Sequence, residues 1–282
     1  NHVQDTGELP LLEAETVVRS LAIAMHSQSE IILPLLQLKE FDQYTTTHST
    51  NVPVLAMAIG EYLGFAGREL RVTVIGSVNL DLVARCSRLP RPGETVTGAT
   101  LARIPGGKGA NQAVACARLG ADVTLVAAVG RDAVADEALV ALHEAGVRLD
   151  LQRLDTATGI ALIVVDAAGE NTITVAPGAN AELGAFDLGP ADAVLAQLEV
   201  PDAAVISAWE QSTGMFCLNA APARAVAVDP DLTVVNRYEL ESLSRRDGLV
   251  AVTLGAEGAI LLEDGEQVAR AASPPVDVVD GT

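Results

Sequence analysis

Short apolar runs alternate with helical stretches from residue 71 onward, and this alternation constrains the fold more than any other feature of the sequence. Residues 111–119 and 132–145 have helical character and separate several of the runs. A chain that alternates strand and helix in this way favours an α/β fold with a mostly parallel sheet. The predicted strands cover residues 72–75, 123–129, 161–165, 172–175, 226–228, 233–235 and 249–254.

One pair of apolar runs departs from this alternation. Residues 159–166 and 171–176 are joined only by Ala-Ala-Gly-Glu, a link that is typical of a β-hairpin. A hairpin inside an α/β layout predicts a flap over a ligand site.

The first 69 residues follow a different pattern from the rest of the chain. Their clearest apolar stretch recurs at three- and four-residue steps, which is typical of an amphipathic helix. This stretch consists of Leu11, Ala14, Val18, Leu21 and Met25. We therefore expect an all-helical segment over residues 1–69 and an α/β domain over residues 71–282.

Charge and cysteine content exclude several classes of function. The chain carries 18 basic and 37 acidic residues, for a formal net charge of −19, which disfavours binding to nucleic acid or to an anionic membrane surface. Cys86, Cys116 and Cys217 lie far apart, which predicts reduced thiols in a cytoplasmic protein. An apolar run of membrane-spanning length is absent from the sequence.

The strongest chemical signal is the loop Pro-Gly-Gly-Lys-Gly-Ala-Asn-Gln-Ala at residues 105–113. Glycines that run into a helix let the backbone approach a ligand and point helix-start amides at it. The loop is not a Walker A motif, because Gly109 follows Lys108 where serine or threonine would hold magnesium. The glycines alone would indicate an ordinary turn. Lys108, one of two lysines, and the polar Asn111 favour a binding loop.

Asn79 and Asp81 follow the first predicted α/β strand and lie two residues apart. In an extended segment both side chains point to one face, where they could bond adjacent hydroxyls of a polyol. Capping of a turn is an equally good interpretation of this pair by itself.

Residues 71–282 resemble the ribokinase branch of the PfkB sugar-kinase family, because eight blocks occur in the family's order. The blocks are Gly-Ser-Val-Asn-Leu-Asp (76–81), Arg-Pro-Gly-Glu-Thr-Val-Thr-Gly (91–98), Gly-Gly-Lys-Gly-Ala-Asn-Gln-Ala (106–113), Gly-Ala-Asn (178–180), Gln-Leu-Glu (197–199), Asn-Ala-Ala-Pro-Ala-Arg (219–224), Asn-Arg-Tyr-Glu (236–239) and Thr-Leu-Gly-Ala-Glu-Gly (253–258). The resemblance implies a Rossmann-type sheet with a small β lid, part of which is the hairpin at 159–176.

The resemblance also assigns roles to individual residues. The sugar hydroxyls would be held by Asn79, Asp81, Gly107, Lys108, Gly109, Asn111 and Glu199. The nucleotide would contact Asn236, Thr253, Gly255 and Gly258. Glu239 would help to place Mg²⁺, and Asp280 and Thr282 would help to bind K⁺. Without the resemblance, Asn236 and Glu239 would be interpreted as a helix cap.

The implied activity is ATP-dependent phosphorylation of D-ribose to ribose 5-phosphate, with ATP, Mg²⁺ and K⁺ as cofactors. Its partners would be the small-molecule sugar and ATP, and relatives also form homodimers through their lid strands. Which sugar is preferred is left open, because related kinases share these motifs.

The sequence departs from the family at its most important motif. The Gly-Ala-Gly-Asp block, whose aspartate would deprotonate the attacking hydroxyl, is absent, and the sequence ends at Thr282 where the block would start. We therefore assign no catalytic residue and expect impaired turnover. The chain is also short between Asn180 and Gln197 and between Glu239 and Leu249, which predicts missing helices and a partly bare sheet face.

Residues 36–52 and 56–64 resemble the opening of an HD-GYP cyclic-di-GMP phosphodiesterase domain. The resemblance makes His48 a metal ligand, but the His-Asp pair and the Gly-Tyr-Pro motif are absent, so His48 is interpreted as a helix-start residue. The chain is then a fusion of two incomplete gene segments. Two alternatives to the kinase follow: an inactive sugar- or nucleotide-binding remnant, and a signalling fragment related to the phosphodiesterase.

Overall fold

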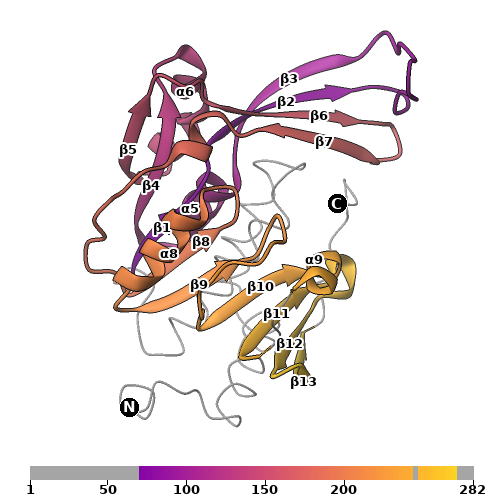
Figure 1. The fold of residues 1–282 in the computed structure, drawn as a ribbon. Coiled ribbons are helices and arrows are strands. Elements are labelled where there is room, and N and C mark those ends of the chain that lie inside the picture. Colours follow the sequence, from indigo (N-terminus) through magenta and orange to yellow (C-terminus); the bar gives the residue numbers. More distant parts are fainter. Residues whose placement is uncertain (1–69, 244–246, 272–282) are drawn as a thin grey trace.

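The computed structural model describes residues 70–243 and 247–271, which form a nine-stranded main sheet and a separate four-stranded sheet (Figure 1). The strands of the main sheet are β1 (Arg71–Ile75), β4 (Asp122–Gly130), β5 (Arg148–Leu154), β8 (Ala193–Gln197), β9 (Met215–Asn219), β10 (Leu232–Asn236), β11 (Leu249–Thr253), β12 (Ala259–Glu263) and β13 (Glu266–Ala271). Their order across the sheet is β13-β12-β11-β10-β9-β8-β1-β4-β5.

Most of the main sheet is parallel, as the alternation of strands and helices predicts. Every neighbouring pair from β11 to β5 runs parallel, and β12 and β13 add an antiparallel edge. Because parallel strands are joined by crossovers, helices cover both faces.

The two faces of the sheet carry separate hydrophobic cores. On one face, α5 (Lys108–Arg118), α6 (Ala133–Ala138) and α7 (Val140–Glu144) pack over Val72 and Val74. On the other face, α8 (Asp202–Gln211) packs over Ile75 and the neighbouring strands. Alternate residues of β1 therefore point into different cores, as the two-residue period of a strand requires. The other helices of the described residues are η1 (Gly178–Glu182), α9 (Arg237–Ser242) and η2 (Gly255–Glu257).

The second sheet projects away from the main sheet like a raised lid (Figure 1). Its strands are β2 (Asn79–Arg85), β3 (Thr100–Gly106), β6 (Gly159–Val165) and β7 (Asn171–Ala176), in the order β3-β2-β6-β7. The antiparallel pairing of β6 with β7 confirms the predicted hairpin. We call these four strands the lid sheet.

Two sequence-based predictions differ from the structure in detail. Residues 226–228 form no strand, because the three-residue run leads directly into Asp229-Pro230 and proline has no N–H for a ladder; Val228 still packs in the core as part of a loop. The single helix predicted over residues 132–145 is divided at Leu139 into α6 and α7. The predicted all-helical segment 1–69 lies outside the described residues.

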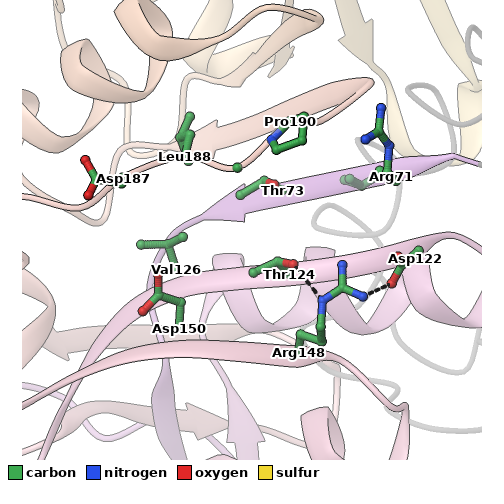
Figure 2. A pocket seen from close by; sticks show the side chains of 12 residues that line it. Arg71, Thr73, Asp122, Thr124, Val126, Arg148, Asp150, Asp187, Leu188 and Pro190 are labelled. Atoms are coloured by element: carbon green, nitrogen blue, oxygen red, sulfur yellow. Dashed lines mark hydrogen bonds and ion pairs between the residues drawn. The ribbon is translucent and has the colours of Figure 1, made fainter.

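Within the described residues, a crossover helix is missing from one face of the main sheet, as the short connection to β8 predicts. After η1, residues 183–192 form no helix on the way to β8. The strand face beneath this crossover opens into a cavity of about 320 Å³, lined by Thr73, Thr124 and Val126 from the strands and by Leu188 and Pro190 from the crossover (Figure 2). The cavity includes the amino ends of β1, β4 and β5, opposite to the edge at which open α/β sheets bind ligands.

No helix within the described residues combines the length and apolar character that crossing a membrane requires.

Candidate functional site

The predicted sugar and nucleotide residues gather at one edge of the main sheet. The parallel strands β1, β8, β10 and β11 all end there, at Ile75, Gln197, Asn236 and Thr253. In the sheet order β10 is two strands from β8, which separates the two groups by about 10 Å. This is the edge at which α/β sheets bind ligands.

The glycine loop lies tightly against the chain that leaves β1. Gly107 is the N-cap residue of α5, with φ 97°, and a Cβ there would lie 2.7 Å from the Ser77 carbonyl oxygen. A Cβ on Gly109 would lie 2.6 Å from the Cα of Gly76, and the amide of Ala110 donates to the Ser77 carbonyl at 2.9 Å. The glycines therefore serve a close backbone approach, more than an ordinary turn needs.

Lys108 and Glu199 form an ion pair at this approach. The Lys108 Nζ lies 3.6 Å from the Glu199 Oε1, with the two side chains 27% and 15% exposed. The other carboxylate oxygen, Oε2, accepts hydrogen bonds from the Ser77 hydroxyl at 2.6 Å and from the Lys108 amide at 3.4 Å. The structure thus brings together two predicted sugar ligands from distant parts of the sequence. Asn111 lies one turn into α5, its amide bonded to the Gly107 carbonyl at 2.9 Å.

Asn79 and Asp81 lie in β2 and share one face of the lid sheet, as their spacing predicts. They are 3% and 2% exposed. Asn180 Nδ2 donates to Asn79 Oδ1 at 2.8 Å, which orients the Asn79 amide. A Cβ on Gly106 would lie 2.5 Å from the Asp81 Cγ, so this glycine makes room for the carboxylate.

The predicted nucleotide residues lie at the ends of β10 and β11. Asn236 and Thr253 are register partners in adjacent strands, and Thr253 Oγ1 donates to the Val235 carbonyl at 3.4 Å. Gly255 begins the turn η2 and Gly258 follows it, with φ of 60° and 92°. These positive φ values suit a tight glycine turn after a strand.

Asn236 and Glu239 form a capping box at the start of α9. Asn236 Oδ1 accepts from the amides of Tyr238 and Glu239 at 2.9 and 2.8 Å, and Glu239 Oε2 accepts from the Asn236 amide at 2.8 Å. The interpretation made from these residues alone, a helix cap, is therefore confirmed.

Metal-binding residues are sparse in the part of the chain that the structure describes. No group of three or more His, Cys, Asp or Glu side chains there could hold a metal ion. Glu239 contributes a single carboxylate, which suits Mg²⁺ bound mainly through water and substrate phosphates. Asp280 and Thr282, the predicted K⁺ residues, lie outside the described residues.

The two buried cysteines, Cys116 and Cys217, are expected to be unreactive. Burial raises the pKa of Cys116 to about 12, and burial, followed by the nearby Asp231 charge, raises the pKa of Cys217 still further. Both thiols therefore stay protonated at neutral pH and are poor nucleophiles and metal ligands. All three cysteines are free, which fits the prediction of reduced thiols.

Ser77, Gln197 and Asn180 were not predicted as site residues. All three are buried, and each contacts a predicted sugar ligand or its backbone. Each lies inside one of the quoted sequence blocks, and Ser77 and Gln197 are two residues from the assigned ligands Asn79 and Glu199. For Asn180, membership of a block was the available signal.

Comparison with known proteins agrees with this geometry. A sequence model of the pfkB family of carbohydrate kinases matches residues 69–282. A ribokinase of Lactococcus lactis is 34% identical over 238 residues, covering 75% of this chain and 79% of the relative. The crystal structure of the ribokinase from Thermotoga maritima matches with a TM-score of 0.66 at 29% identity, covering 75% of this chain and 80% of that one. A ribokinase of Arabidopsis thaliana, complexed with ribose and ATP, matches with a TM-score of 0.61 at 27% identity, covering 75% and 80% of the two chains.

The chain therefore belongs to the pfkB family of carbohydrate kinases, and within it to the ribokinase-like sugar kinases. The family match begins at residue 69, so it does not extend over the segment that was compared with HD-GYP domains. That resemblance finds no support here, and residues 1–69 and His48 lie outside the described residues.

Proposed function

We propose that this chain binds D-ribose and ATP at the carboxyl edge of the main sheet, as a ribokinase-like sugar kinase. The observation that carries the proposal is the convergence of Asn79 and Asp81 with the Lys108–Glu199 ion pair around the glycine loop. Carboxylates accept hydrogen bonds from sugar hydroxyls, while an amide and an ammonium donate to them, so the set suits a polyol.

The nucleotide residues would hold ATP beside the sugar. The ends of β10 and β11 and the glycines around η2 offer backbone amides and space for phosphates or ribose. Glu239 would order the water shell of Mg²⁺, which neutralises phosphate charge when it is bound. The raised lid sheet would exclude water from the sugar.

Residues 1–282 offer no Gly-Ala-Gly-Asp aspartate, so we assign no residue to deprotonation of the sugar hydroxyl. An inactive sugar-binding remnant is the second candidate.

Calorimetry with D-ribose tests the sugar site, and ADP formation with ATP, Mg²⁺ and K⁺ tests turnover. Asp81→Ala should weaken ribose binding at least about tenfold, because hydrogen bonds to a charged group are lost. Asp155→Ala, which changes an exposed carboxylate near the base of the lid sheet, is the matched control and should leave binding unchanged. Equal affinities of the wild type and Asp81→Ala would refute the sugar site. Ribose binding without ADP formation would favour the inactive remnant.

We also propose a homodimer formed through the lid sheets. Ile173 and Val175 of β7 are 52% and 42% exposed, and by register they share the face of Asn79 and Asp81. Light scattering should give twice the mass of the chain, and Ile173→Asp should shift it to the monomer. A monomeric wild type would refute the dimer.

A further inference from the structure

Ser77 lies at the centre of a buried hydrogen-bond network beside the sugar site. Its side chain is fully buried. Its hydroxyl oxygen accepts from Gln197 Nε2 at 3.5 Å and from the Gly109 amide at 3.4 Å, and it donates to Glu199 Oε2 at 2.6 Å.

The number of bonds fixes the direction of the hydroxyl hydrogen. A serine hydroxyl has one hydrogen and two lone pairs. Two N–H groups approach the lone pairs of Ser77, so its single hydrogen points to the Glu199 carboxylate. This is the shortest of the three contacts, as expected for a hydroxyl bonded to a carboxylate.

Gln197 fixes the other end of the network. Its Oε1 accepts from the Glu199 backbone amide at 2.6 Å, which turns its Nε2 toward Ser77. Gly76 makes this possible, because a Cβ there would collide with the Gln197 amide group. Glu199 is thus held at its backbone by Gln197 and at its carboxylate by Ser77.

The geometry points to Ser77 and Gln197 as positioning residues that hold the Glu199 carboxylate for the sugar, an inference that rests on the proposed function. Oε2 is occupied by the Ser77 hydroxyl and the Lys108 amide. Oε1 pairs with the Lys108 ammonium, and both side chains are partly exposed. One oxygen is therefore anchored in the protein while the other is directed, with Lys108, toward the ligand.

A double-mutant cycle on D-ribose affinity tests this inference in the full chain. Ser77→Ala should weaken binding about tenfold, because the bond to a charged group is lost. In the Glu199→Gln background the same substitution should have a smaller further effect, because the hydrogen bond from Ser77 has lost its charged acceptor. Ser207→Ala, which changes a hydrogen-bonded serine on α8, is the control. Ser77→Cys keeps the volume with a weak donor and replaces Ser77→Ala if that variant does not fold.

Acetylation of Lys108 gives a second readout that needs no sugar. The chain has only two lysines, so Lys39 is the internal reference in mass spectrometry. Loosening Glu199 should expose the Lys108 amine, so Ser77→Ala and Glu199→Gln should both raise its acetylation rate. The double variant should react no faster than Glu199→Gln.

The two readouts separate this inference from the proposed function. Suppose that the wild type binds no ribose, but Ser77→Ala and Glu199→Gln both raise Lys108 acetylation and the double variant reacts no faster than Glu199→Gln. The positioning role then stands and the proposed function fails. If ribose binds, and Ser77→Ala weakens ribose affinity by the same factor in the wild type and in Glu199→Gln, the positioning role fails and the proposed function stands. Unchanged acetylation in Ser77→Ala and Ser77→Cys would also overturn the positioning role.

Discussion

At the carboxyl edge of the main sheet, the predicted sugar residues and the predicted nucleotide residues are held in place in different ways. On the sugar side, the bonds join residues far apart in the sequence: Ser77 and Glu199 are 122 positions apart, and Val78 and Asn180 are 102 apart. On the nucleotide side, Asn236 bonds to residues two and three positions away. The sugar half therefore depends on the whole fold, whereas the nucleotide half is built largely from local structure.

This contrast predicts that substitutions on the sugar side will cost more stability than those on the nucleotide side. Substitutions on the sugar side should also damage ribose binding and folding together.

Gly109→Ala should cause the largest loss of stability, about 3 kcal/mol, together with loss of ribose binding. The new Cβ would lie 2.5 Å from the carbonyl carbon of Gly76 and 2.6 Å from the Ser77 nitrogen, and backbone atoms cannot move aside as a side chain can. Urea unfolding measures the loss. Gly189→Ala, where no atom lies within 4 Å of the new Cβ, is the control. Equal stability of the two variants would contradict the close approach.

Asn180→Ala should cost about 2 kcal/mol, because buried groups lose their partners. Asn180 bonds the Val78 amide at 2.9 Å, the Val78 carbonyl at 3.0 Å and Asn79 Oδ1 at 2.8 Å. Ribose affinity should fall as well, since the Asn79 amide loses its orienting bond. Thermal unfolding and calorimetry check both effects, and a stable variant with full affinity would show that Asn79 is oriented by other groups.

Asn236→Ala should cost about 1 kcal/mol through loss of the N-cap of α9. Asn236→Asp keeps an acceptor at the cap and should retain most of the stability, so the pair separates capping from other roles. Ribose affinity should be the same in both variants, because the effect is local. A loss of ribose binding in Asn236→Ala would break the distinction between the two halves.

Asp192→Asn should have the smallest effect, about 0.5 kcal/mol at pH 7, because the Arg71 partner is half-exposed. The side-chain hydrogen bonds from Arg71 hold the pKa of Asp192 below its usual value, against a smaller effect of burial. A lowered folded-state pKa contributes stability above the unfolded pKa, which is about 3.9, and that stability is lost as the pH falls through the folded pKa. Melting temperatures of the two proteins should therefore differ at pH 7 and converge in acid. A difference that persists in acid would point to lost packing.

Local elements were predictable because their causes are local. The hairpin of β6 and β7, the shared face of Asn79 and Asp81 and the cap formed by Asn236 and Glu239 all follow from spacing of four residues or fewer. The prediction of a strand over residues 226–228 was wrong, and the cause is local as well. Asp229-Pro230 follows directly, and proline has no N–H to donate to a neighbouring strand. Seven strands were not predicted: β2, β3, β5, β8, β9, β12 and β13. Among them, β8 (Ala-Val-Leu-Ala-Gln) and β9 (Met-Phe-Cys-Leu-Asn) lack the β-branched runs that mark the predicted strands. A strand that is buried on both faces of a parallel sheet needs apolar residues, and these need not be β-branched.

The α/β alternation, the family blocks and the residue types able to hold a sugar follow from the sequence alone, because periodicity and spacing are properties of neighbouring residues. Which of those residues contact one another depends on the tertiary structure. Pairing of β1 with β8 brings Ser77 to Gln197 and Glu199, and the close approach of α5 to Gly76 directs the Ser77 hydroxyl. The cavity between the strands and residues 187–190 also depends on how a short crossover spans the sheet. Contacts between distant residues arise from packing, and a linear pattern does not contain them.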